Sequence, residues 1–175
     1  DWSSDVCSSD LALSGDRILT MDWIEGVPLA EFAKQNHPQA IKNKIGQALW
    51  NFYDYQIFEL KAVHADPHPG NFIVTPDFKL GVIDFGCVKE IEEQFHKDYF
   101  TLLNSDAINN DSEFTRIMYK LEFLLNDDDP KIVPVLKKAF QEMLNLLGKP
   151  FNSKTFDFGD EAYFKSINCS NRCFS

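Results

Sequence analysis

The stretch from His64 to Gly86 constrains the fold of this chain more than any other, because a predicted β-hairpin joins two polar clusters. It reads HADPHPGNFIVTPDFKLGVIDFG. The runs 72–75 and 78–83 are rich in β-forming residues, and Pro76 and Asp77 between them are typical turn residues. A hairpin brings its two outer ends together. The sequence therefore predicts that the polar residues on either side of the hairpin converge.

Those polar residues are of the kind that binds a hard cation. Asp66 and Asn71 precede the hairpin, and Asp84 follows it. Two carboxylates and an amide oxygen suit Mg²⁺, which takes few protein ligands and completes its octahedron with water and phosphate oxygens. We therefore expect a magnesium and phosphate site where the two ends of the hairpin meet.

The spacing H-x-D-x-x-x-x-N followed by D-F-G resembles the catalytic loop and metal-binding loop of protein kinases. In that template Asp66 accepts the proton of the attacking hydroxyl, and Asn71 and Asp84 hold the metal ions that bridge the nucleotide phosphates. The resemblance further implies that His64 braces the catalytic loop. It implies that Gly70 permits a backbone turn beside the phosphates.

A transition-metal site is the alternative for the first cluster, because His64, Asp66 and His68 alternate along the chain and imidazole suits zinc or iron. Pro67 and Pro69 interrupt any regular strand or helix that would align those side chains. No cysteine lies nearby to complete a tetrahedral zinc site. We therefore favour phosphoryl transfer.

The strings HADPHPGN and LGVIDFG resemble the UbiB family, also called the ABC1 or AarF family, of atypical kinase-like proteins. The resemblance extends from Ile18 to Leu103, and Ala65 stands where kinases usually carry arginine. It implies a kinase-like fold that binds ATP and Mg²⁺ and acts as an ATPase or an atypical small-molecule kinase. It also implies a link to ubiquinone biosynthesis, with an isoprenoid lipid or a quinone precursor as a partner besides the nucleotide.

Residues 17–23 are predicted to form a strand, and 24–27 a connector. In a kinase-like fold this segment is the hinge between the lobes, whose backbone binds adenine. The resemblance thus makes Met21, Asp22 and Trp23 candidates for the adenine pocket. An ordinary edge strand is the alternative.

Helical periodicity dominates the rest of the chain. Pro28 and Pro38 fit the first turns of two helices, the second ending near Val63. Further helices are predicted from 91, from 113 with Ser112 as N-cap, and from 130 to 147. No A-P-E sequence follows the D-F-G, which favours a small-molecule substrate or ATP hydrolysis over phosphorylation of a peptide.

We therefore expect an α+β, mostly helical fold that corresponds to the C-terminal lobe of a protein kinase, with a small catalytic hairpin. The expected parts are a disordered or non-native leader (1–10), the hinge strand and connector (11–27), the lobe (28–150) and a weakly structured tail (151–175). The phosphate-binding lysine of a kinase belongs to an N-terminal lobe, which is largely absent. The chain is thus interpreted as a fragment that is inactive by itself.

The net charge of -10 and the pI near 4.8 argue against a nucleic-acid partner. No run is apolar enough to span a bilayer, so membrane association would need segments outside this chain. The four cysteines show no disulfide framework, which favours a cytoplasmic location. A peripheral position at the inner membrane is the alternative location, reached through such outside segments. Two other functions stay open: a phosphotransferase of the aminoglycoside or choline kinase type, and a non-catalytic nucleotide-binding module.

Overall fold

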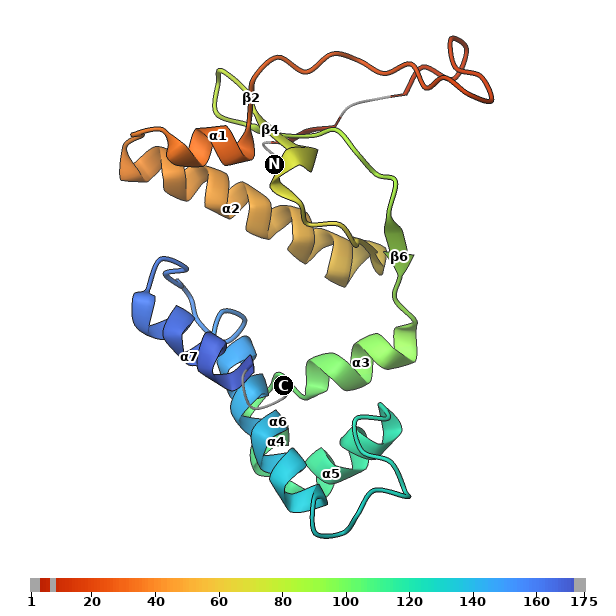
Figure 1. Cartoon of the computed structure of the whole chain (residues 1–175), viewed down its shortest axis with the longest axis vertical. Helices are drawn as coiled ribbons and strands as arrows, with labels where there is room; N and C mark the ends of the chain where they lie inside the picture. The colour runs from red at the N-terminus through yellow and green to blue at the C-terminus, as the bar shows by residue number, and fades with distance from the viewer. Residues whose placement is uncertain (1–3, 7–8, 172–175) are drawn as a thin grey trace. The chain divides into compact units, whose positions relative to one another are not determined.

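A computed structural model describes residues 4–6 and 9–171 of the chain. It divides into two units, 1–91 and 92–175, which are described separately (Figure 1). Helices make up most of the regular structure, and the strands are short. The fold is thus α+β and mostly helical, as expected from the sequence.

The first unit contains a four-stranded sheet in the order β1-β5-β4-β2. Its centre is the predicted hairpin, in which β4 (Phe72–Val74) pairs antiparallel with β5 (Leu80–Val82). At the turn the N–H of Thr75 donates to Lys79 O at 3.0 Å, and the Thr75 hydroxyl donates to Asp77 Oδ1 at 2.6 Å. The hairpin prediction is confirmed.

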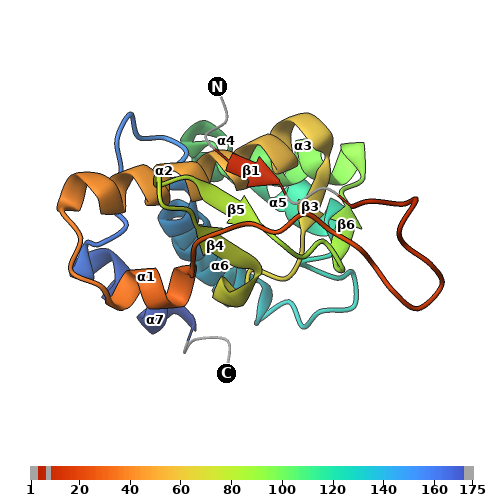
Figure 2. The same ribbon diagram turned by 90° about the horizontal axis from the view of Figure 1, so that it is seen from above.

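Two helices pack against this hairpin, α1 (Leu29–Lys34) and α2 (Gln39–Tyr55) (Figures 1 and 2). Pro28 and Pro38 are their N-caps. Both positions suit proline, because a helix leaves its first N–H groups without an internal partner. The buried apolar side chains of helices and hairpin form one core: Phe32, Ile45, Ala48, Phe52, Phe72, Val74, Leu80 and Val82.

The helix before the catalytic loop ends earlier than predicted. After Tyr55 the chain forms a π-helical segment (η1, Gln56–Leu60) and then a left-handed residue, Lys61, with φ 53°. A short strand, β3 (Ala62–His64), follows and pairs antiparallel with β6 (Val88–Glu90). Pairing satisfies the backbone of 62–64, which a continued helix would have satisfied internally.

The N-terminal segment differs from expectation in two places. Within the predicted leader 1–10, Ser4–Val6 forms strand β1 parallel to β5 (Figure 2), while 1–3 and 7–8 lie outside the described residues. Backbone pairing with a sheet edge needs no apolar side chains, which explains why composition did not reveal it.

The strand predicted over 17–23 is wrong, because the segment forms only isolated bridges, Ser9 to Met21 and Gly15 to Ile18. The Thr20 carbonyl accepts a hydrogen bond from Asp10 N at 2.9 Å, so the segment folds back on itself. β-propensity stabilises a strand only where a neighbouring strand is available to pair with it. The last residue of the connector, Val27, does pair with β4, together with Pro28, as strand β2 (Val27–Pro28).

The second unit is helical. Its helices are α3 (Glu93–Thr101), α4 (Ser105–Asn109), α5 (Asp111–Lys120), α6 (Val133–Gly148) and α7 (Glu161–Asn171). Its core is formed by the buried side chains Leu102, Leu103, Ile108, Phe114, Ile117, Met118, Leu124 and Leu144. In the described part of the chain, no helix is both long and apolar enough to cross a membrane.

Two boundaries in this unit differ from the sequence prediction. Asn110, not Ser112, caps α5, because its Oδ1 accepts a hydrogen bond from Glu113 N at 3.2 Å. The tail expected to be weakly structured contains α7. The Tyr163 side chain is buried and its hydroxyl donates to Leu146 O at 3.3 Å, so a tertiary contact with α6 stabilises this helix.

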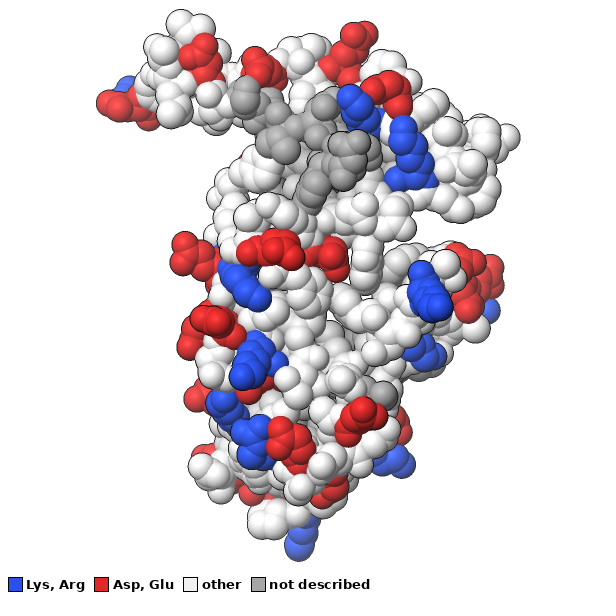
Figure 3. Space-filling model, turned by 180° about the vertical axis from the view of Figure 1, so that it is seen from behind, with Lys and Arg blue, Asp and Glu red and all other residues white. Residues whose placement is uncertain are grey.

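Charges of both signs are mixed on the surface. On the face shown in Figure 3, Lys and Arg side chains are interspersed with Asp and Glu. Within the second unit, ion pairs join Arg116 to Glu113 at 2.7 Å and Lys137 to Asp111 at 2.6 Å.

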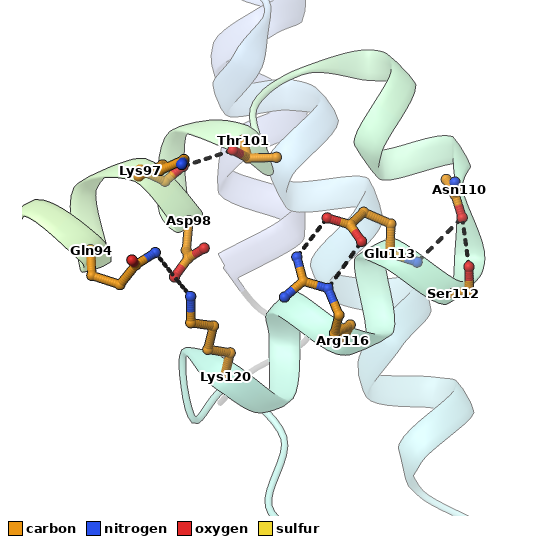
Figure 4. A network of polar contacts seen from close by, with 9 residues as sticks. All are labelled: Gln94, Lys97, Asp98, Thr101, Asn110, Ser112, Glu113, Arg116 and Lys120. Carbon is orange, nitrogen blue, oxygen red and sulfur yellow. Dashed lines mark hydrogen bonds and ion pairs between the residues drawn. The ribbon is translucent and has the colours of Figure 1, made fainter.

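One ion pair of the second unit joins α3 to α5, and its carboxylate is largely buried while its lysine is partly exposed (Figure 4). Asp98 of α3 contacts Lys120 of α5 at 2.6 Å and accepts a hydrogen bond from Gln94 at 2.9 Å. The Asp98 side chain is only 10% exposed. The hydrogen bond from Lys120 lowers the pKa of this carboxyl, outweighing burial, which raises it.

Replacing Lys120 with methionine is expected to lower the free energy of unfolding by about 1–2 kcal/mol, because Asp98 loses its cation. Since the pKa of Asp98 is lower in the folded state than its ordinary 3.8, the pair stabilises the fold above that pH. Its contribution is lost as pH falls through the folded-state pKa. The melting temperature, measured by thermal unfolding at about pH 7 and about pH 3, should therefore fall less between these two pH values in Lys120→Met than in the unaltered chain.

Lys165→Met is the matched control, because Lys165 and Glu161 are 78% and 87% exposed and 3.4 Å apart. It should change stability by less than about 0.5 kcal/mol. Equal effects of the two substitutions would contradict the stabilising role of the Asp98–Lys120 pair.

Candidate active site

His64 connects the two halves of the candidate site. Its side chain is 2% exposed, and its Nε2 is 2.5 Å from the carbonyl oxygen of Asp84. Its Nδ1 accepts a hydrogen bond from the N–H of Asp66 at 3.3 Å. Both contacts require the tautomer with its proton on Nε2. One imidazole therefore holds the backbone of Asp66 and of Asp84 on its two sides.

Asn71 contacts Asp66 with its side chain and the residue before Asp84 with its backbone. Its Nδ2 donates to both the carbonyl oxygen and Oδ2 of Asp66, each at 3.2 Å. The backbone carbonyl oxygen of Asn71 accepts a hydrogen bond from the N–H of Ile83, the residue before Asp84, at 3.1 Å. The amide nitrogen thus faces Asp66, which leaves Oδ1 as the side-chain oxygen suited to a cation.

Asp84 closes a turn with its own side chain. Its Oδ1 accepts a hydrogen bond from the N–H of Gly86 at 2.7 Å. The other carboxylate oxygen, Oδ2, is therefore the one suited to bind a cation. A Cβ at Gly86 would lie 3.0 Å from Oδ1, a tight contact that glycine avoids. The bond from Ala65 N to Cys87 O, at 2.8 Å, links the same two loops a second time. The structure thus brings together the two loops that carry Asp66, Asn71 and Asp84.

Gly70 lies in the 3₁₀ turn η2 (Pro69–Asn71), and its N–H donates to Nδ1 of His68 at 3.0 Å. A Cβ at Gly70 would lie 2.9 Å from that nitrogen, so a larger residue here would force the His68 ring to move. The residue therefore shapes the loop between Asp66 and Asn71.

The adenine-pocket candidates lie in a different part of the first unit. Met21, Asp22 and Trp23 belong to the exposed segment before β2, where the Trp23 side chain is 91% and the Met21 side chain 44% exposed. Met21 forms an isolated bridge with Ser9. The role of the three residues in binding adenine stays a prediction.

The transition-metal alternative gains no support. In the part of the chain that the structure describes, no three His, Cys, Asp or Glu side chains are arranged to hold a metal ion. Both ring nitrogens of His64 are within hydrogen-bonding distance of the backbone. The donors gathered here are oxygens, which suit Mg²⁺ rather than zinc.

Sequence reasoning missed Gln56. Its side chain is buried, its Oε1 accepts the N–H of His64 at 2.6 Å, and its Nε2 donates to Phe52 O at 3.2 Å. It thus attaches the start of the catalytic loop to the end of α2. The sequence feature that could have identified it is its position four residues after Phe52, which places a polar side chain on the apolar face of the helix.

Tyr53 also lies close to the site. Burial raises the pKa of its hydroxyl, and the negative charge of Asp66 raises it further. Its ring packs at 6.4 Å from that of Phe72, the residue after Asn71. The wall behind the catalytic loop is therefore aromatic.

Together the fold and the order of the site residues define the C-terminal lobe of a protein-kinase-like protein. The ABC1 atypical kinase-like domain matches residues 10–118. The chain belongs to this family.

Curated relatives agree with this assignment. The chain is 34% identical over 153 residues to the chloroplastic protein ACTIVITY OF BC1 COMPLEX KINASE 3 of Arabidopsis thaliana, covering 85% of this chain and 21% of the relative. It is 28% identical over 152 residues to the mitochondrial atypical kinase COQ8 of Schizosaccharomyces pombe, covering 85% and 24%. It thus spans only about a quarter or less of the length of these relatives.

A solved structure shares the fold. The complex of Rv3197 with erythromycin from Mycobacterium tuberculosis superposes with a TM-score of 0.70, at 24% sequence identity, over 94% of this chain and 40% of that one. At this level of identity the similarity concerns the fold alone.

Proposed function

We propose that the site of Asp66, Asn71 and Asp84 binds ATP and Mg²⁺ and takes part in phosphoryl transfer, as in an atypical kinase or ATPase. The observation that carries the proposal is the bridge by His64 between Asp66 and Asp84. It supports a division of labour in which Asp66 faces the attacking hydroxyl or water and Asp84 faces the metal.

Magnesium fits the residues present. Asn71 Oδ1 and Asp84 Oδ2 would hold it, because the other polar atom of each side chain is already engaged within the protein. When bound, the ion would neutralise charge on the nucleotide phosphates. The protein's own part is to fix the two oxygens in place before binding, which electrostatic stabilisation requires.

The family membership supports a substrate linked to ubiquinone or another isoprenoid lipid, because a relative carries the name COQ8. We propose such a small molecule, rather than a peptide, as the acceptor. A position at the surface of a membrane would give access to it. The second candidate, a phosphotransferase of the aminoglycoside or choline kinase type, shares the H-x-D-x-x-x-x-N spacing.

The test measures nucleotide binding by the 175-residue chain. NMR spectra are recorded while the chain is titrated with Mg²⁺ and a non-hydrolysable ATP analogue. Asp84→Asn retains an oxygen for the turn to Gly86 but removes the charge that would face the metal. We expect about tenfold weaker binding or more, since hydrogen bonds and contacts to charged groups contribute about 1.5–3 kcal/mol.

Asp157→Asn is the matched control. Asp157-Phe158-Gly159 repeats the three letters in the second unit, and Asp157 Oδ1 accepts the N–H of Gly159 at 2.8 Å, much as in the site. This substitution should leave binding within about twofold. The proposal would be contradicted if Asp84→Asn and Asp157→Asn weakened nucleotide binding equally, or if neither weakened it. We also expect the chain alone to turn over no ATP, and turnover that Asp84→Ala abolishes would overturn this part of the proposal.

A further inference from the structure

Tyr53 of α2 carries a hydroxyl group that none of the roles described so far uses. Its oxygen is buried, and among the residues that the structure describes it has no hydrogen-bond partner. Removing a hydroxyl from water without giving it a partner is costly, and buried polar groups in proteins are almost always bonded. We therefore expect this hydroxyl to find its partner in another state of the protein.

Packing contacts place Tyr53 behind the catalytic loop. Its ring lies 6.4 Å from that of Phe72, and the ring of His64 lies 6.2 Å from the same phenylalanine. Residues three positions apart are neighbours on a helix, so Tyr53 lies beside Gln56, whose side chain accepts the N–H of His64. The tyrosine is thus fixed by the same residues that fix the start of the loop.

The carboxylate of Asp66 is the acceptor that the site offers to this hydroxyl. Burial raises the pKa of Tyr53 and the negative charge of Asp66 raises it further, so the two groups are close enough to interact. A carboxylate can accept about four hydrogen bonds. That of Asp66 receives one from the N–H of His68 at 3.3 Å and one from Nδ2 of Asn71 at 3.2 Å. Both are long, as is common for catalytic groups before a ligand binds, and they leave room for a further donor.

We propose that Tyr53 is a positioning residue, whose hydroxyl donates a hydrogen bond to the carboxylate of Asp66 when Mg²⁺ and nucleotide bind. This inference rests on the proposed function, in which Asp66 faces the attacking hydroxyl or water. A bond from the helix side occupies one carboxylate oxygen and thereby holds the other toward the acceptor. Tyr53 acts through Asp66 and touches neither the nucleotide nor the acceptor.

Tyr53→Phe removes the hydroxyl and retains the ring that packs against Phe72. Without nucleotide, the midpoint of urea unfolding should stay unchanged or rise, because the variant lacks a buried hydroxyl that has no partner. Binding of Mg²⁺·AMP-PNP to the 175-residue chain, followed by NMR, should become about five- to tenfold weaker through the loss of one hydrogen bond to a charged group. Stability and affinity should therefore respond differently to the same substitution.

Two further readouts distinguish positioning from a purely structural role. In an Asp66→Ala background the acceptor is gone, so adding Tyr53→Phe should change the affinity for Mg²⁺·AMP-PNP by less than about twofold. The second readout uses a chain labelled with ¹³C at Cζ of its five tyrosines. Mg²⁺·AMP-PNP should shift the signal that is missing in Tyr53→Phe, because this carbon carries the hydroxyl.

Tyr99→Phe is the matched control, because burial also raises the pKa of Tyr99, which lies on α3 in the second unit. It should leave the affinity within about twofold. An equal loss of affinity from Tyr53→Phe with and without Asp66→Ala would show a purely structural role and overturn the inference. Unchanged affinity in Tyr53→Phe would also overturn it, while the proposed function would stand if Asp84→Asn still weakens binding. If the unaltered chain binds no nucleotide, both proposals fail.

Discussion

Replacing His64 with leucine is expected to lower the free energy of unfolding by about 2–4 kcal/mol, because two hydrogen bonds are lost in a buried setting. Leucine leaves the Asp84 carbonyl oxygen and the Asp66 N–H without the ring that now bridges them. It also removes a ring packed 5.9 Å from Phe85 and 6.2 Å from Phe72. Urea unfolding followed by circular dichroism measures the loss.

His64→Gln is the control that isolates the bridge. Its amide can still donate to the Asp84 carbonyl oxygen, while the contact with Asp66 N is lost. We expect this variant to lose about half as much stability as the leucine variant, since one of the two hydrogen bonds remains. If leucine and glutamine have the same effect, the link between the two loops does not depend on the imidazole.

Gly26→Ala is expected to destabilise the first unit by about 2–3 kcal/mol, because a Cβ there collides with backbone atoms. It would lie 2.4 Å from the carbonyl oxygen of Val74 and 2.5 Å from Cγ2 of Ile73. A carbonyl group in a paired strand cannot rotate away as a flexible side chain can. The pairing of β2 with β4 would have to shift, and denaturant unfolding would report the change.

Gly46→Ala provides the opposite expectation. Gly46 lies inside α2, and a Cβ at this position meets nothing within 4 Å. Alanine should therefore stabilise the chain by about 0.5–1 kcal/mol through its higher helix propensity. If both glycine substitutions destabilise the chain equally, the close approach at Gly26 is not the cause.

The predictions from sequence succeeded where the signal was local. Pro76 and Asp77 marked the turn of the hairpin, and Pro28 and Pro38 marked the starts of two helices. Proline acts on its own φ angle and on its own missing N–H group, so its effect hardly depends on distant residues. Convergence of the loop residues then followed from the geometry of a hairpin.

The errors arose where a distant partner decides the conformation. The run 17–23 has the composition of a strand, yet it forms only isolated bridges. Ser4–Val6 has little strand character and pairs with β5. The helix α7 became regular because Tyr163 is buried and bonds to Leu146. Periodicity in one segment does not say which other segment is available to pair with it or cover it.

By itself the sequence determined the hairpin, the stripe of apolar residues on α2, and the identity of the three oxygen-bearing residues at the hairpin ends. Only the tertiary structure decided how they are held: one buried imidazole lies between Asp66 and Asp84, and Gln56 accepts the backbone N–H of the histidine that carries it. The physical reason is that a hydrogen bond between residues 20 positions apart depends on where the chain returns. Spacing and composition describe one segment at a time, and the return of the chain is a property of the whole unit.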